Sequence, residues 1–262
     1  MLKIKKAFSK IRRAFCNDRA DYGFRGYYFS WESAKADCDG YDSDKIFQKA
    51  ILSAETVKNG WAAYERDTVL YYEKEYNYPL VTYINKALLD SQDSIKEVVD
   101  FGGAFGSTYQ QNKDLFPDDI KWTIVEQEHF VKYGKVHFTD EHLSFEYSIE
   151  NVTSKTCVLC SGSLQYIMNY KEYLDLMIQK GFMYIIIERT SVSDKEWIMI
   201  QNVQEPIYEA SYPLYVFKED DFIKYFTSKN YRLIDSWISL VDGIIEYAGS
   251  TVREKSFVFK KC

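Results

Sequence analysis

After residue 95 the sequence alternates short apolar runs with segments that suit α-helices, and this alternation constrains the fold more than any other feature. Strands are predicted at 95–101, 122–126, 143–147, 157–160 and 183–188. Helices are predicted around 129–133, 170–179 and 222–226. Strands that alternate with helices indicate a mostly parallel sheet, and open sheets of this kind bind ligands at the carboxyl ends of their strands.

Two further strands are predicted at 231–239 and 256–260, with no helix between them. We expect them to form an antiparallel pair that closes the sheet. The sequence therefore predicts an α/β fold with a seven-stranded, mostly parallel sheet over residues 95–262.

The segment before residue 95 has a helical pattern instead. Residues 46, 47, 50, 51, 54 and 57 are apolar at helical spacing, and Gly60 is expected to end that helix. Further helical runs are predicted at 61–76 and 79–89. We expect residues 21–94 to form an N-terminal helical cap, preceded by a basic amphipathic tail at residues 1–20.

The tail differs in charge from the rest of the chain. Six basic residues precede the first acid, although the whole chain has 33 Lys and Arg against 39 Asp and Glu, a formal net charge of −6. Apolar residues fall near helical spacing in the tail, which suits either an amphipathic helix at a membrane surface or a solvated terminus. The mildly acidic balance does not suit general nucleic-acid binding. The chain lacks both the long apolar run of a membrane-spanning helix and the apolar core of a secretory signal.

Five cysteines, an odd number, are scattered along the chain, which favours reduced thiols and a cytoplasmic protein. Cys157 and Cys160 have the spacing of a metal or redox pair, but they lie in an apolar run that reads as a buried strand. The three histidines show no strong ligand signature, so no metal site is predicted.

The segment Val98 to Ser107 carries the clearest chemical signal. A hydrophobic strand ends in Asp100, and Gly102, Ala104 and Gly106 then allow a close approach of a ligand to the backbone before a helix can start. Glu126 ends the next strand, 24 residues after Gly102, where it can accept hydrogen bonds from a ribose diol.

Two nucleotide-type cofactors use such a layout. A nicotinamide-binding Gly-x-Gly-x-x-Gly loop counted from Gly102 would give Gly102, Ala104 and Ser107, with two glycines missing. S-adenosylmethionine has a sulfonium and an ammonium group and no phosphate, so Asp100 favours this cofactor and would repel a pyrophosphate. The third interpretation is a glycine turn without a ligand.

This segment resembles the first motif of the class I S-adenosylmethionine-dependent methyltransferases, whose domain is Rossmann-like. The resemblance implies that Asp100, Gly102, Gly103, Ala104 and Gly106 hold the methionine and ribose part of the cofactor. It further implies that Glu126 binds the ribose hydroxyls, with Gln127 beside the adenine. Ser161, Gly162, Ser163 and Leu164 would line the cofactor, and Gln165 and Tyr166 the acceptor.

A narrower resemblance covers nearly the whole chain. Segments at 26–34, 40–42, 64–67, 161–166 and 204–213 are similar to a family of bacterial methyltransferases associated with surface-polysaccharide biosynthesis. This resemblance implies that Tyr64 and Arg66 approach the carboxylate end of the cofactor, although a helical Arg66 between two acids also suits a surface ion pair. Tyr208 and Tyr212, between the fifth strand and the last helix, would shape an acceptor pocket.

A hydroxyl acceptor must lose its proton during methylation. Glu188, at the end of the fifth predicted strand, is the first candidate for the base, and its alternative role is to pair with Arg189, which we also place near the substrate. His129 ranks lower because it follows the second strand, on the adenine side.

The sequence thus favours a cytoplasmic methyltransferase, and its tail is either a contact to the inner membrane surface or a solvated terminus. The expected reaction is O-methylation of a surface glycan, its activated sugar precursor or a phosphate-type group. The alternatives are a non-catalytic binding protein on the same scaffold and a nicotinamide-dependent sugar-modifying enzyme. The oligomeric state is left open.

Overall fold

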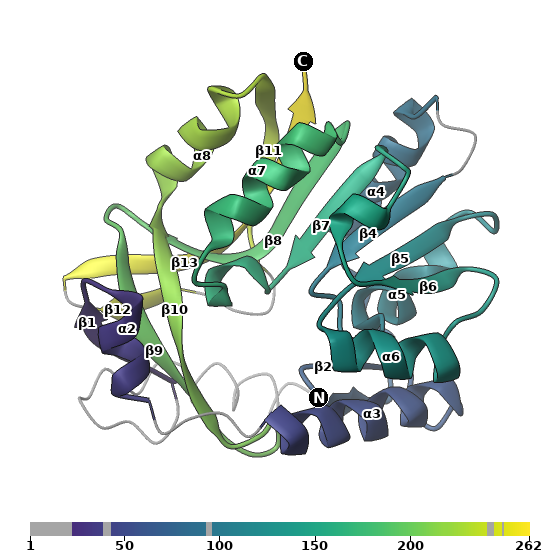
Figure 1. The fold of residues 1–262 in the computed structure, drawn as a ribbon, viewed down its shortest axis with the longest axis horizontal. Helices are drawn as coiled ribbons and strands as arrows, with labels where there is room; N and C mark the ends of the chain where they lie inside the picture. The colour runs from purple at the N-terminus through teal and green to yellow at the C-terminus, as the bar shows by residue number, and fades with distance from the viewer. Residues whose placement is uncertain (1–22, 39–42, 93–95, 240–243, 248) are drawn as a thin grey trace.

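The computed structural model describes residues 23–38, 43–92, 96–239, 244–247 and 249–262 (Figure 1). The predicted basic tail at 1–20 and the segment 40–42 lie outside the described residues. Within the described ranges, no helix is long and apolar enough to cross a membrane.

The centre of the molecule is a sheet in which seven strands follow the order β6-β5-β4-β7-β8-β13-β11. These strands are β4 (Glu97–Phe101), β5 (Lys121–Val125), β6 (Leu143–Glu146), β7 (Cys157–Ser161), β8 (Tyr184–Ser193), β11 (Tyr231–Ile238) and β13 (Ser250–Lys261). The pairs from β6 to β8 are parallel, whereas β13 runs antiparallel to both β8 and β11. The predicted α/β fold with a mostly parallel, Rossmann-like sheet and a closing antiparallel pair is confirmed.

Helices cover both faces of this sheet, and alternate residues of each strand contact opposite layers. In β7, Cys157 and Leu159 pack into one core, and Val158 and Cys160 pack into the other. The first core also contains α3 (Ser43–Lys58), α4 (Tyr78–Asp90), α5 (Ser107–Asn112) and α6 (Glu128–His137). The second contains α7 (Tyr170–Lys180) and α8 (Glu219–Thr227) (Figure 1). The prediction that both cysteines lie in a buried strand is confirmed.

A second group of strands extends the sheet beyond β8. β10 (Ala210–Lys218) pairs with the far end of β8 through Phe217 and Lys218 and continues into an antiparallel ladder with β9 (Trp197–Val203) and β1 (Gly23–Tyr28). The short helix α2 (Trp31–Ala36) packs on one face of this extension through Ala34, and β12 (Ile244–Tyr247) pairs with β13. Tyr212 lies between the fifth predicted strand and the last predicted helix, as expected, but in a strand that was not predicted, β10.

The helices predicted at 43–59 and 79–89 are confirmed as α3 and α4. The helix predicted at 61–76 is wrong. That segment contains an antiparallel hairpin of β2 (Tyr64–Arg66) and β3 (Val69–Tyr71), in which the Tyr64 and Tyr71 rings stack with centroids 4.6 Å apart. Arg66 is therefore on a strand and not on a helix.

Candidate functional site

The turn after β4 has a backbone that departs from ordinary loop geometry. Gly102, Ala104 and Gly106 all have positive φ values, of 77°, 49° and 91°. A Cβ atom at Gly103 would lie 2.6 Å from the Asp100 carboxyl group, so the turn folds over that side chain only because residue 103 is glycine. The turn then leads into α5, which starts at Ser107.

Asp100 lies beneath this turn and is 1% exposed. Its Oδ2 atom accepts a hydrogen bond of 3.0 Å from Trp122 Nε1, whereas its Oδ1 atom has no hydrogen-bond partner among the described residues. Burial raises the pKa of Asp100 to about 7, and the nearby Glu126 and Glu188 carboxylates add to the rise. A buried carboxylate oxygen without a donor is costly, and a cationic ligand group would supply what is missing.

Glu126 follows β5 and lies at the carboxyl edge of the sheet, as predicted from its position in the sequence. The Gln127 backbone N–H donates a hydrogen bond of 2.6 Å to its Oε2 atom. Burial raises the pKa of Glu126, and the backbone N–H groups of Gln127 and Ala104 oppose the rise. The hydrogen bond from the Ala104 backbone N–H thus connects the Glu126 carboxylate to the glycine turn.

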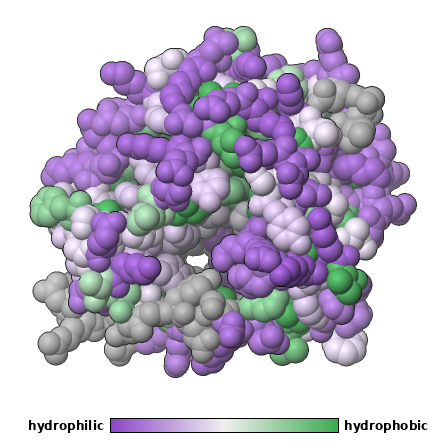
Figure 2. Space-filling model, in the orientation of Figure 1, coloured by the Kyte–Doolittle hydropathy of each residue, from purple (hydrophilic) through white to green (hydrophobic). Residues whose placement is uncertain are grey.

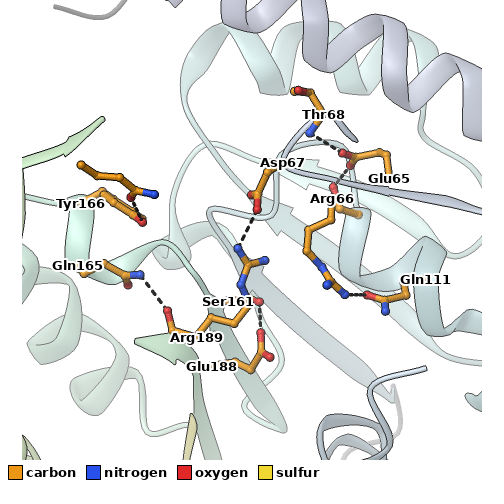
Figure 3. A network of polar contacts seen from close by, with 12 residues as sticks. Glu65, Arg66, Asp67, Thr68, Gln111, Ser161, Gln165, Tyr166, Glu188 and Arg189 are labelled. Atoms are coloured by element: carbon orange, nitrogen blue, oxygen red, sulfur yellow. Dashed lines mark hydrogen bonds and ion pairs between the residues drawn. The ribbon is translucent and has the colours of Figure 1, made fainter. Parts of the chain in front are cut away.

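The β2–β3 hairpin lies across from this turn and contributes three consecutive charged residues (Figure 3). Arg66 donates a hydrogen bond of 2.8 Å to Gln111 Oε1 on α5 and lies over the Tyr64 and Tyr71 rings. Glu65 accepts hydrogen bonds from the Ser107 hydroxyl and, at 3.1 Å, from the Thr68 backbone N–H. Burial raises the pKa of Glu65. Among the described residues no carboxylate pairs with Arg66, so its charge remains available to an anionic group.

Glu188 and Arg189 are consecutive in β8, yet both side chains line the same cleft. The cause is a β-bulge. On β13 the pairing advances by two residues, from Lys255 to Phe257, while on β8 it advances by three, from Thr190 to Ile187. Arg189 takes a φ of 57° in this bulge. Bulges redirect side chains in this way and are common beside active sites.

The partners of these two residues differ from the predicted pairing of Glu188 with Arg189. Asn77 Nδ2 donates a hydrogen bond of 2.9 Å to Glu188 Oε1, and the Ser161 hydroxyl donates to Glu188 Oε2. Arg189 does not pair with Glu188 in these contacts but forms an ion pair of 2.9 Å with Asp67 at the tip of the hairpin (Figure 3). The hairpin is therefore tied to β8 across the cleft.

The segment after β7 supports the turn as well as the cleft. Ser163 Oγ donates a hydrogen bond of 2.9 Å to the Phe101 carbonyl, Leu164 is fully buried, and a Cβ atom at Gly162 would lie 3.3 Å from the Arg189 guanidinium. Gln165 Nε2 donates to the Arg189 carbonyl at 2.8 Å. These contacts position the loop and the bulge relative to each other.

Three tyrosines lie beyond the bulge. The Tyr166 hydroxyl donates a hydrogen bond of 2.7 Å to Gln201 Oε1 on β9, and its ring packs edge-on against Tyr212 with centroids 5.2 Å apart. The hydroxyls of Tyr208 and Tyr212 lie 3.4 Å apart. Burial raises the pKa values of Tyr166 and Tyr212 well above their ordinary range, so both remain neutral.

These elements enclose one cleft with a volume of about 210 Å³. The space-filling view, in the orientation of Figure 1, shows a small opening near the centre of the molecule, beside hydrophilic residues (Figure 2). The cleft brings together most of the residues predicted for the cofactor and some of those predicted for the substrate, namely Asp100, Gly102, Gly103, Ala104, Glu126, Gln127, Ser161, Arg66, Glu188, Arg189 and Tyr208. The other predicted residues do not line the cleft, namely Gly106, Gly162, Ser163, Leu164, Tyr64, Gln165, Tyr166 and Tyr212.

The sequence interpretation missed several polar residues of the cleft. Asp67, Asn77 and Gln111 bind the predicted residues Arg189, Glu188 and Arg66, respectively, whereas Glu65 and Ser107 bind each other. Among the described residues, five other than glycine have a positive φ, and four of these line the cleft: Asp67, Thr68, Ala104 and Arg189. Backbone strain concentrates at functional sites, which supports a functional role for this cleft. No group of three or more potential metal ligands occurs within the described ranges.

No protein-family model matches the sequence, and no curated protein matches it. Similar solved structures include the N-terminal domain of EvdMO1 with S-adenosylhomocysteine and D-fucose (TM-score 0.48, 10% identity, 85% of this chain and 98% of that chain). The CcbJ methyltransferase from Streptomyces caelestis (TM-score 0.47, 12% identity) covers 80% of this chain and 96% of its own. The 1,6-didemethyltoxoflavin-N1-methyltransferase from Burkholderia thailandensis (TM-score 0.45, 12% identity) covers 84% and 88%. At such identities the chemistry of this chain has to be argued from its own residues.

Proposed function

We propose that this protein is an S-adenosylmethionine-dependent methyltransferase that methylates a hydroxyl group of a glycan or of an activated sugar. The observation that carries the proposal is the buried Asp100 carboxylate, which faces the cleft beneath a turn of small residues and whose Oδ1 atom receives no hydrogen bond from the part of the chain that the structure describes. The ammonium group of this cofactor is the kind of donor that the carboxylate lacks.

The other charged groups of the cleft fit the same cofactor. Arg66 offers a cation to the carboxylate of the methionine part, and Glu126 offers acceptors to the ribose diol. A nicotinamide dinucleotide fits less well, because Asp100 and Glu126 would repel its pyrophosphate. The helix that follows the turn, α5, has only six residues and offers a weak N-terminal dipole to a phosphate.

S-adenosylmethionine, when bound, supplies a methyl group on a positively charged sulfur that leaves as a neutral thioether. The protein has to hold the acceptor in line, exclude water and take up the proton of the reacting hydroxyl. Glu188 is our candidate for the proton acceptor, since it is 3% exposed and faces the cleft. Asn77 and Ser161 each occupy one lone pair of its oxygens, which leaves further acceptor positions for a substrate hydroxyl.

The acceptor end supports a sugar substrate. Tyr208 lines the cleft, and the rings of Tyr212 and Tyr166 lie directly behind it. Tyrosine rings offer apolar area for a sugar face together with a hydroxyl donor. We place the protein in the cytoplasm, where the cofactor and sugar precursors are made, and leave contact of the basic tail with the membrane surface as part of the proposal.

The proposal is tested by calorimetry with S-adenosylmethionine, S-adenosylhomocysteine and NAD. We expect both sulfur nucleotides to bind and NAD not to bind, and we expect Asp100→Ala and Glu126→Ala each to weaken binding by about tenfold or more. Asp118→Ala, an exposed carboxylate at the opposite edge of the sheet, is the matched control. Tight binding of NAD alone would favour the nicotinamide alternative. Binding of the sulfur nucleotides without turnover on any acceptor would favour the non-catalytic one.

A further inference from the structure

The charges that line the cleft are strongly unequal. Within the described ranges, five carboxylates (Glu65, Asp67, Asp100, Glu126, Glu188) face two guanidinium groups (Arg66, Arg189). When all are ionised the lining carries a charge of −3, the difference between two positive and five negative groups. A bound S-adenosylmethionine, with two positive groups and one negative group, would offset only part of this charge.

The two guanidinium groups differ in how much of their positive charge is available to a ligand. Arg66 contacts the neutral amide of Gln111 and keeps its charge for an anion at the cofactor end. Arg189 is at the acceptor end, and there its charge is compensated by Asp67, with Nη2 and Oδ2 2.9 Å apart. The Arg189 side chain is 17% exposed, so this ion pair is partly shielded from solvent.

The bulge in β8 places Glu188 beside this compensated pair. The other polar residues that the structure describes there are neutral: Thr68, Asn77, Ser161 and Tyr208. The acceptor end therefore has a net negative charge and several neutral hydrogen-bonding groups. A phosphate placed beside Glu188 would be repelled by the like charge of its carboxylate, which is screened less in a partly buried cleft than in water. A hydroxyl can instead donate a hydrogen bond to the same carboxylate.

We propose that the acceptor is an uncharged sugar bearing a free hydroxyl, and that Asp67 sets this preference by compensating Arg189. The inference rests on the proposed methyltransferase function and selects the neutral glycan over the activated sugar, the two acceptor classes that the proposed function leaves open. Sugar phosphates and nucleotide-linked sugars are poor acceptors for the same electrostatic reason. Asp67 is thus a specificity-determining residue, and its ion pair with Arg189 joins the hairpin tip to the acceptor end.

The test measures methyl transfer by mass spectrometry on matched acceptors: methyl glycosides, the same sugars as 1-phosphates, and the same sugars linked to uridine diphosphate. For the sugar that reacts best, we expect kcat/KM of the methyl glycoside to be at least about 100-fold higher than that of the same sugar as a 1-phosphate or linked to uridine diphosphate. Asp67→Asn releases the Arg189 charge, so the preference should fall by about tenfold in that variant. Asp67→Glu should retain the preference, and Asp118→Asn, which removes an exposed charge at the opposite edge of the sheet, should leave it unchanged.

Each outcome bears on one of the two proposals. A wild-type preference for phosphorylated or nucleotide-linked sugars overturns the inference, and so does the absence of transfer to every neutral sugar while S-adenosylhomocysteine binds normally. An unchanged preference in Asp67→Asn, with normal cofactor binding, removes Asp67 from the specificity role. Failure of S-adenosylhomocysteine to bind the wild-type protein refutes the methyltransferase function itself, and the inference with it.

Discussion

The two ends of the cleft are built in different ways. Most of the cofactor end comes from one continuous segment, in which β4, the turn at 102–106, α5 and β5 follow one another in the chain, and Arg66 of the β2–β3 hairpin joins it through Gln111. The acceptor end combines the hairpin tip at Asp67, the bulge at Glu188 and Arg189, and Tyr208, which precedes β10. The comparison indicates that cofactor binding depends on a local supersecondary unit, whereas acceptor choice depends on long-range contacts. Variants at the two ends should therefore affect different kinetic quantities.

The largest effect is expected at the acceptor end, in Glu188→Gln. This change keeps the size of the side chain but removes the group that takes the proton of the acceptor hydroxyl. Loss of general base catalysis typically lowers kcat by about 10²–10⁴-fold. Steady-state kinetics should show this fall, while the affinity for S-adenosylhomocysteine, measured by calorimetry, should change by less than about threefold.

Glu172→Gln, on the exposed face of α7, is the matched control and should retain the wild-type kcat. A large loss of cofactor affinity in Glu188→Gln would contradict the separation of the two ends. An unchanged kcat would remove Glu188 from the role of base.

The converse experiment is Arg66→Gln at the cofactor end. Arg66 has no carboxylate partner among the described residues, and its charge is therefore our candidate for pairing with the methionine carboxylate. Loss of one partner in a partly buried charge pair costs about 2 kcal/mol or more, which corresponds to roughly 30-fold in cofactor affinity. The acceptor KM should remain within about threefold of the wild-type value.

The same substitution at Arg232, an exposed arginine on β11, should leave cofactor affinity unchanged. If Arg66→Gln instead raised only the acceptor KM, the hairpin would belong entirely to the acceptor end.

A smaller effect is expected from pH, again at the cofactor end. Burial, together with Glu126 and Glu188, raises the pKa of Asp100 to about 7, and the Trp122 N–H only partly opposes this rise. The ammonium group of the cofactor binds the ionised carboxylate, so affinity should increase by roughly tenfold between about pH 6 and about pH 8. Calorimetry across this range measures the increase, and Asp100→Asn should abolish it.

The raised pKa also affects the stability of the protein without a ligand. The folded state retains a proton on Asp100 up to about pH 7, whereas an unfolded chain releases it near pH 3.9. Because the folded state binds more protons in this window, the contribution of Asp100 to stability decreases as pH rises from about 4 to about 7. Asp100→Asn should flatten this part of the stability profile in chemical denaturation.

The unequal construction of the two ends also explains what could be predicted from the sequence. The turn at Asp100–Gly106 and the position of Glu126 follow from residues close together in the chain, and the structure places them along one cleft. The extension was missed because its partners are distant. Arg25 and Asn202, for example, are hydrogen-bonded across 177 positions. Pro213 is an unusual residue for a strand, and it lies where β10 pairs only with β9 and not with β8.

The hairpin was mistaken for a helix because its turn lacks the usual signals. Asp67 and Thr68 occupy the two turn positions with φ values of 51° and 67°, where glycine or asparagine is the common choice. The bulge at Arg189 has no sequence signal either, because it depends on the register of β13 against β8. Asp67 and Arg189 meet only in the folded chain, so the specificity role of Asp67 could not be inferred from the sequence.

The smallest effect is expected from Ala104→Gly, which tests whether the cofactor turn stores strain. Ala104 has a φ of 49°, a conformation that costs an L-residue about 1–2 kcal/mol and glycine almost nothing. This relief offsets the entropic penalty of glycine and the loss of one partly buried methyl group. Ala50→Gly, in the helix α3, has the same entropic penalty and the same loss of a methyl group, but it relieves no backbone strain. Denaturant unfolding should therefore find Ala104→Gly more stable than Ala50→Gly by about 1–2 kcal/mol, and equal stabilities would mean that the turn is not strained at residue 104.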